Sequence, residues 1–189
     1  MLTLQDFIDT GALLEGHFRL SSGLHSGRYL QCARLLMWPE RAEAAGKELA
    51  GKLSEFPAQF VVAPAMGGII IGHEVARALE IPFVFAERQD GAFALRRGFR
   101  LPPGEPVIVV EDVFTTGKST REASAAVESA GGRVLAVGSI VDRGLPAGAF
   151  SVPARSLLSL SVPSWPEAEC PLCRQGVAID SPGSRFTKR

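Results

Sequence analysis

The sequence predicts an α/β fold in which helices cover both faces of a parallel sheet. From residue 60 onward, short apolar runs alternate with stretches whose apolar residues recur at helical spacing. The runs FVVAP, PFVFA, VIVV and VLAVGSIV are continuously apolar. Continuous runs are typical of strands that are buried on both faces and joined by helical crossovers. With 189 residues, 46% of them hydrophobic, we expect one domain over residues 1–189.

The remaining elements follow from local patterns. Thr3 precedes an amphipathic stretch that predicts a first helix ending near Gly11 to Gly16. HFRL and RYLQ flank the polar segment SSGLHSG, which predicts two short strands and a tight loop. Pro39 suits the first turn of a helix with one apolar face. Further helices are expected over residues 69–80 and 118–130, and a last strand over ARSLLSLSV.

Overall charge excludes some function classes. Twenty basic residues balance twenty acidic ones, so no net field would draw the protein to nucleic acid or to an anionic membrane. The first residues contain no basic leader with an apolar core, and the odd number of cysteines argues against a disulfide framework. We expect a soluble cytoplasmic protein with no nucleic-acid or membrane partner.

Residues 107–120, VIVVEDVFTTGKST, carry the clearest chemical signal. Ligands of open parallel sheets bind beyond the carboxyl ends of the strands, and this segment runs from a strand into a helix. The backbone N–H groups of residues 116–119 and the neighbouring hydroxyls are suited to holding a phosphate at the helix N-terminus. Glu111 and Asp112 are suited to accepting hydrogen bonds from vicinal hydroxyls, such as those of a ribose. The expected ligand is therefore a phosphosugar.

A nucleoside-triphosphate P-loop is the main alternative, because Gly117-Lys118-Ser119 matches the end of that motif. Asp112 stands where the first glycine of the motif would be. A carboxylate repels triphosphate oxygens at that position, so we reject this interpretation.

The segment VIVVEDVFTTGKST closely resembles the phosphoribosyl-pyrophosphate (PRPP) motif of type I phosphoribosyltransferases, and HFRLSSGLHSGRYL resembles the amino-terminal region of orotate phosphoribosyltransferases. The resemblance implies a parallel sheet flanked by helices with a small N-terminal hood. The hood would comprise roughly residues 1–38 together with the C-terminal segment, and the core roughly residues 39–162. It also implies a flexible loop over roughly residues 87–105 that closes over the active site of a neighbouring subunit, and hence a homodimer.

The resemblance assigns PRPP to a set of positions around the motif. Glu111 and Asp112 would hold the ribose hydroxyls, and Gly67, in the turn APAMGG, would lie at the pyrophosphate. Arg88, in the loop, would act with the two acids in catalysis by stabilising the departing pyrophosphate. Mg²⁺ would arrive mainly with PRPP, without a metal site built from protein side chains. The full expected PRPP set is Gly67, Arg88, Glu111, Asp112, Val113, Phe114, Thr115, Thr116, Gly117, Lys118 and Ser119.

For orotate, the resemblance implies Arg143 as the carboxylate-binding residue, with Thr115, Ser21 and Tyr29 completing the pocket. The sequence departs from the family in charge. Many members carry lysine at the positions of Gly67 and Ser21, and lysines and a histidine in the loop, where this chain has only Arg88, Arg96, Arg97 and Arg100.

Two other functions remain open on sequence alone: transfer to a different nucleobase, and non-catalytic regulation by PRPP binding. Cys170-Pro171-Leu172-Cys173 offers two zinc ligands, but the chain has no second close pair and its histidines are scattered. We therefore expect no zinc site and no redox role for this pair. His73 lies among apolar residues of a predicted helix, so we expect it to pack rather than to react.

Overall fold

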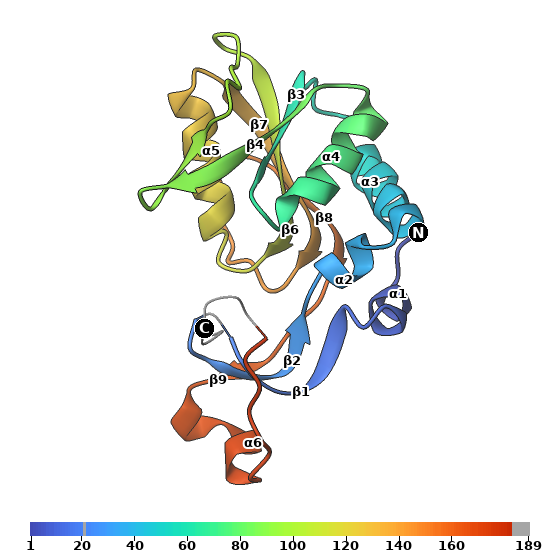
Figure 1. Cartoon of the computed structure of the whole chain (residues 1–189), viewed down its shortest axis with the longest axis vertical. Helices are drawn as coiled ribbons and strands as arrows, with labels where there is room; N and C mark the ends of the chain where they lie inside the picture. The colour runs from blue at the N-terminus through green and yellow to red at the C-terminus, as the bar shows by residue number, and fades with distance from the viewer. Residues whose placement is uncertain (21, 183–189) are drawn as a thin grey trace.

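The computed structural model describes residues 1–20 and 22–182 and contains a large and a small sheet (Figure 1). The helices are α1 (Leu4–Asp9), α2 (Ala33–Leu36), α3 (Pro39–Leu53), α4 (Gly68–Leu79), α5 (Lys118–Ser129), the 3₁₀ helix η1 (Glu167–Glu169) and α6 (Pro171–Arg174). The strands are β1 (Leu13–Arg19), β2 (His25–Leu30), β3 (Phe60–Pro64), β4 (Phe83–Gln89), β5 (Ala92–Leu95), β6 (Pro106–Phe114), β7 (Arg133–Asp142), β8 (Ala154–Ser159) and β9 (Ser164–Trp165). No helix among these has the length and apolar character needed to cross a bilayer.

The large sheet has the strand order β5-β4-β3-β6-β7-β8. Every neighbouring pair in it is parallel except β4 and β5. Helix α4 leads from β3 outward to β4, whereas α5 leads from β6 outward in the opposite direction to β7. The winding therefore reverses between β3 and β6. The predicted α/β class is confirmed.

Hydrophobic cores lie on both faces of this sheet. On β6, Ile108 and Val110 pack with α3 and α4, while Val107 and Val109 pack with α5 on the other face. Successive residues of a strand point to opposite faces, so a continuous apolar run is what a strand covered twice requires. Figure 1 shows α5 on one side of the sheet and α3 and α4 on the other.

The small sheet has the antiparallel order β1-β2-β9. Its last strand follows β8 near the end of the chain, and an isolated bridge joins Phe18 to Asp180. The C-terminal segment thus adds to a sheet begun by the first 30 residues, at one end of the molecule (Figure 1). We call the three strands β1, β2 and β9, with η1 and α6, the hood.

Several boundaries differ from those that the sequence predicted. Residues 25–27 belong to β2, so the loop of the hairpin is shorter than SSGLHSG. The segment after residue 87 begins as regular structure. Strand β4 continues to Gln89, and the chain then turns back into β5, which pairs with it. The polar C-terminal segment contains β9, η1 and α6 beyond the predicted last strand.

His73 packs as expected, but at the surface and not inside the core. Its side chain is exposed on α4, and its ring lies edge-on to that of Phe83, with centroids 5.9 Å apart. Helical spacing placed it among apolar residues, but one of them, Ile70, is itself exposed.

Candidate active site

The acidic pair lies where the winding of the sheet reverses. Glu111 and Asp112 belong to β6, which continues beyond the apolar run because its pairing with β7 extends to Phe114 and Asp142. The pairing of β3 with β6 stops at Val62 and Val109, so the ends of these two strands are not hydrogen-bonded to each other. A crevice at such a reversal is the usual ligand site of an open α/β sheet.

Two helix N-termini flank this reversal of the sheet from opposite faces. Helix α4 begins at Gly68, after β3, and α5 begins at Lys118, after β6. The first backbone N–H groups of a helix have no intrahelical partner and carry partial positive charge. Two anionic groups of one ligand can therefore be held here, one at each helix.

Close packing brings the β3–α4 turn against the acidic pair. A Cβ atom at Gly67 would lie 2.8 Å from Asp112 Oδ2, and one at Gly68 would lie 2.8 Å from the carbonyl oxygen of Val110. The Ala65–Met66 peptide bond in this turn is cis. Gly67 thus has a steric reason to lack a side chain, and the lysine of other family members would not fit without moving Asp112.

The β6–α5 loop is shaped by glycine and by an arginine. Gly117 has φ +73°, and a Cβ atom there would lie 2.9 Å from the Phe150 ring. Arg121 Nη1 donates to the carbonyl oxygens of Thr116 at 2.9 Å and Ala149 at 3.2 Å. The side chains of Lys118 and Ser119 are exposed at the start of α5. Arg121 was not singled out in the sequence, because an arginine at that position of a helix carries no distinctive signal.

Val113 and Phe114 contribute differently from the other residues of the motif. The Phe114 side chain is buried in the core beneath α5, and Val113 packs against the core beneath α3 and α4. Only their backbone is therefore placed for ligand contact. The Val113 N–H donates to Asp112 Oδ1 at 2.8 Å, which orients that carboxyl group.

Burial sets the protonation of the acidic pair. Glu111 is 7% exposed, and burial raises its pKa well above the usual range, with the charge of Asp112 acting in the same direction. Burial also raises the pKa of Asp112. The Asp112 N–H donates to Glu111 Oε1 at 3.3 Å. The pair is thus more stable with fewer than two negative charges unless hydroxyl donors or a cation contact it.

Residues from the hood and from β7 extend the site beyond the acidic pair. Burial raises the pKa of Tyr29, which the positive charge of Arg143 opposes and the negative charge of Asp112 reinforces. Burial lowers the pKa of Arg143, and its interaction with Tyr29 opposes that shift. These three side chains, predicted from separate segments, therefore lie within electrostatic reach of one another.

The turn after β7 fixes the backbone of Arg143. The Arg143 N–H donates to the carbonyl oxygen of Phe114 at 2.9 Å, and Asp142 Oδ1 accepts from the N–H groups of Gly144 and Leu145. Two further neighbours of the site, Asp142 and Cys32, were not singled out by sequence patterns. Cys32 is buried, and its Sγ lies 4.0 Å from the Asp112 carbonyl oxygen. Asp142 directly precedes Arg143, and aspartate favours turns, so this turn could have been predicted from the sequence.

Among the described site residues, Arg88 has its contacts away from the acidic pair. Arg88 lies on β4, where it pairs with Glu122 of α5, donates to the carbonyl oxygen of Gly91, and covers the ring of Phe93. Ser21 lies outside the described residues.

Residues 31–174 match the phosphoribosyl transferase domain. The chain belongs to the phosphoribosyltransferase family. It is 51% identical, over 95% of its length and 96% of the relative, to the orotate phosphoribosyltransferase of Thermotoga maritima, and 51% identical, over 95% of both chains, to that of Carboxydothermus hydrogenoformans. The crystal structure of orotate phosphoribosyltransferase from Aeropyrum pernix superposes with a TM-score of 0.71 at 28% identity, covering 82% of this chain and 92% of that one. The resemblance read from the two motifs is confirmed.

Proposed function

We propose that this protein transfers the 5-phosphoribosyl group from PRPP to orotate, giving orotidine 5′-monophosphate and pyrophosphate in pyrimidine synthesis. One observation supports this above the others: the acidic pair lies at the reversal of the sheet, with a helix N-terminus on each side. PRPP has a ribose diol between a 5′-phosphate and a pyrophosphate, and this arrangement offers a complementary group to each. The high identity to orotate phosphoribosyltransferases supports orotate as the base.

In this proposal, each part of the site has a separate task. Glu111 and Asp112 accept hydrogen bonds from the ribose hydroxyls, and their raised pKa values fall when those donors bind. The N–H groups at the start of α5 hold the 5′-phosphate, and those of the β3–α4 turn hold pyrophosphate. Arg143 binds the orotate carboxylate with its guanidinium fork, beside the ring of Tyr29. Held in this way, N1 of orotate displaces pyrophosphate at the anomeric carbon.

The donor set of the crevice fits the metal that we propose. Mg²⁺ would arrive on the phosphate oxygens of PRPP, and the oxygen atoms of Glu111 and Asp112 are the donor type that tolerates this ion nearby. When bound, Mg²⁺ would neutralise charge on the departing pyrophosphate. The arginine-rich segment adds positive charge from the protein, and its Arg88 pairs with Glu122 of α5.

We further propose a cytoplasmic homodimer, in which the loop over roughly residues 87–105 serves the neighbouring subunit. Sedimentation at several protein concentrations tests the assembly. A fully active monomer would contradict the shared site.

The function is tested by following the ultraviolet absorbance of orotate after mixing protein, PRPP and Mg²⁺. We expect a loss of orotate that requires both PRPP and Mg²⁺, and a weaker apparent affinity for orotate in Arg143→Ala with PRPP affinity retained. Arg133→Ala, at the opposite end of β7, is the matched control. Absence of turnover with PRPP binding intact by calorimetry would favour the regulator, and turnover of another nucleobase alone would redirect the substrate assignment.

A further inference from the structure

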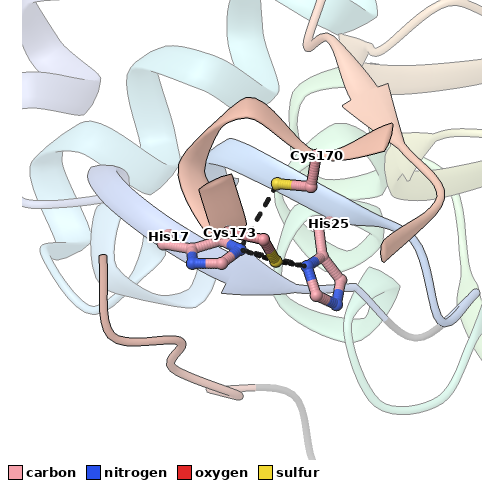
Figure 2. Close-up of side chains that lie close together, drawn as sticks. All are labelled: His17, His25, Cys170 and Cys173. Atoms are coloured by element: carbon pink, nitrogen blue, oxygen red, sulfur yellow. Dashed lines mark hydrogen bonds between the residues drawn. The ribbon is translucent and has the colours of Figure 1, made fainter. Parts of the chain in front are cut away.

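Four metal-binding side chains meet in the hood, in a cluster separate from the acidic pair. His17 lies on β1, His25 begins β2, Cys170 precedes α6 and Cys173 lies within it. Their ligand atoms all lie within 4.8 Å of one another. Figure 2 shows the two imidazole rings and the two sulfur atoms pointing toward a common centre.

The distances between these atoms suit a tetrahedral ion. Zinc–sulfur bonds of about 2.3 Å and zinc–nitrogen bonds of about 2.0–2.1 Å place neighbouring ligand atoms roughly 3.3–3.8 Å apart. His17 Nε2 lies 3.0 Å from His25 Nδ1, 3.5 Å from Cys170 Sγ and 3.7 Å from Cys173 Sγ. His25 Nδ1 lies 3.2 Å from Cys173 Sγ. Small shifts would bring all four atoms to bonding distance from one central ion.

The hydrogen bond on the far side of His17 orients its lone pair toward the cluster. His17 Nδ1 lies 2.7 Å from the carbonyl oxygen of Val177, which can only accept, so Nδ1 carries the proton. In the neutral ring, Nε2 then presents a lone pair to the other three side chains. His25 Nδ1 and the two sulfur atoms all approach this one lone pair, whereas a metal ion would use all four ligand atoms at once. A carbonyl that fixes the outer nitrogen is also the usual support of a metal-bound histidine.

The ligand types and their burial favour zinc in a structural role. Two thiolates and two imidazoles are a common set for structural Zn²⁺, and they balance its charge. His17 is 4% exposed, His25 3% and Cys170 0%, whereas Cys173 is partly exposed. Three of the four ligands are therefore closed to a substrate. The three cysteines are all free thiols. The closely spaced Cys pair supplies two ligands from one short turn, and the β1–β2 hairpin supplies the other two.

We propose that His17, His25, Cys170 and Cys173 bind one structural Zn²⁺ that fastens the C-terminal segment to the β1–β2 hairpin. The surrounding elements are small: β9 has two residues and α6 has four. Backbone hydrogen bonds at Arg19, His17 and Asp180 add a further link. Elements of this size bury little apolar surface, and small units of this kind are commonly stabilised by a metal.

This corrects the expectation drawn from the sequence. The histidines looked scattered because 148 residues separate His25 from Cys173. Antiparallel pairing of β1 with β2 brings His17 and His25 together, and β9 brings the cysteines to them.

The test is the metal content of the full-length protein, purified under reducing conditions without a histidine tag. We expect about one zinc per chain by mass spectrometry of the metal, as a single four-ligand site requires. Cys173→Ser removes a partly exposed ligand and should lose stoichiometric zinc, as should Cys170→Ser. His73→Gln and Cys32→Ala change the same residue types outside the cluster and should retain the metal.

A second measurement does not depend on the variants folding. Wild-type protein stripped of metal and loaded with Co²⁺ should show the intense visible bands of a tetrahedral site and thiolate-to-cobalt charge transfer. Folded wild-type protein that takes up neither Zn²⁺ nor Co²⁺ would overturn the proposal. So would stoichiometric zinc in the Cys170→Ser, Cys173→Ser double variant, or a Cys170–Cys173 disulfide in place of the metal.

Discussion

Glu111, which we propose to contact the ribose, has a position that lowers the stability of the folded protein. Burial raises its pKa in the folded protein, so between the ordinary value of 4.5 and the raised value the folded state binds more protons than the unfolded state. Stability contributed by this group is therefore present below pH 4.5 and is lost as pH rises toward neutrality. We expect Glu111→Gln to raise the melting temperature at neutral pH, with a difference that shrinks as the pH approaches 4.5. Thermal unfolding across this range measures it, with the exposed Glu128→Gln as control; a difference that grows toward acid would contradict the burial argument.

Gly67 tests whether contact with the β3–α4 turn positions Asp112. Its φ of −59° suits any residue, so Gly67→Ala adds no backbone strain and acts through the Cβ atom that would meet Asp112 Oδ2. We expect kcat/KM for PRPP to fall about 10–100-fold, as a small misplacement of a reacting group does, with little change in melting temperature. Gly51→Ala is the control, because nothing lies near its Cβ position. Unchanged PRPP kinetics in Gly67→Ala would show that this contact is not needed.

Gly117 and Gly148 form a matched pair, since both have φ +73° but only Gly117 faces the Phe150 ring. Gly148→Ala should cost about 1–2 kcal/mol from left-handed backbone strain alone. Gly117→Ala should cost about 2–4 kcal/mol, because overpacking against Phe150 adds to that strain. Chemical denaturation measures both free energies of unfolding. Equal losses would mean that the ring moves aside freely.

At the scale of elements, the β4–β5 hairpin holds Arg88 in a contact that is easily released. The Arg88–Glu122 pair is partly exposed, and such pairs contribute only about 0–1 kcal/mol. If Arg88 stabilises departing pyrophosphate, Arg88→Ala should lower kcat about 100-fold with little change in stability. Arg97→Ala, which removes the Glu87 pair on the same hairpin, should keep most of the activity. Equal losses in the two variants would assign the effect to the hairpin rather than to Arg88.

At the scale of the whole molecule, we predict how the proposed zinc ion in the hood affects stability. Chelation of zinc should lower the melting temperature by about 5–10 °C, as expected for a loss of about 2–4 kcal/mol in a protein of this size, and added Zn²⁺ should restore it. Because β2 carries both His25 and Tyr29, the Cys173→Ser variant should bind orotate more weakly while binding PRPP normally. It should also show no response to the chelator; a chelator effect of equal size in that variant would point to another metal.

The sequence predicted correctly those elements whose local residue pattern is compatible with only one structure. The continuous apolar runs were confirmed as β3, β4, β6 and β7, because a strand buried on both faces can tolerate little else. Glu111-Asp112 and the following loop were found by spacing along one segment. Distant pairings left no such local signal: β9 has only two residues, and its place beside β2 depends on tertiary contacts. The same reason hid the His-Cys cluster, whereas the proximity of Tyr29 to Arg143 was expected only through the family resemblance.

The place of β9 in the hood also bears on how the protein is made. During synthesis β1 and β2 emerge first, whereas the strand that pairs with β2 follows the entire large sheet. Until then β2 has an open edge, and such edges recruit strands from other chains. A released chain that ends before Ser164 contains every strand of the large sheet and still exposes that edge. Premature termination late in the message should therefore produce truncated chains prone to association, although they contain the whole of β6 with its acidic pair.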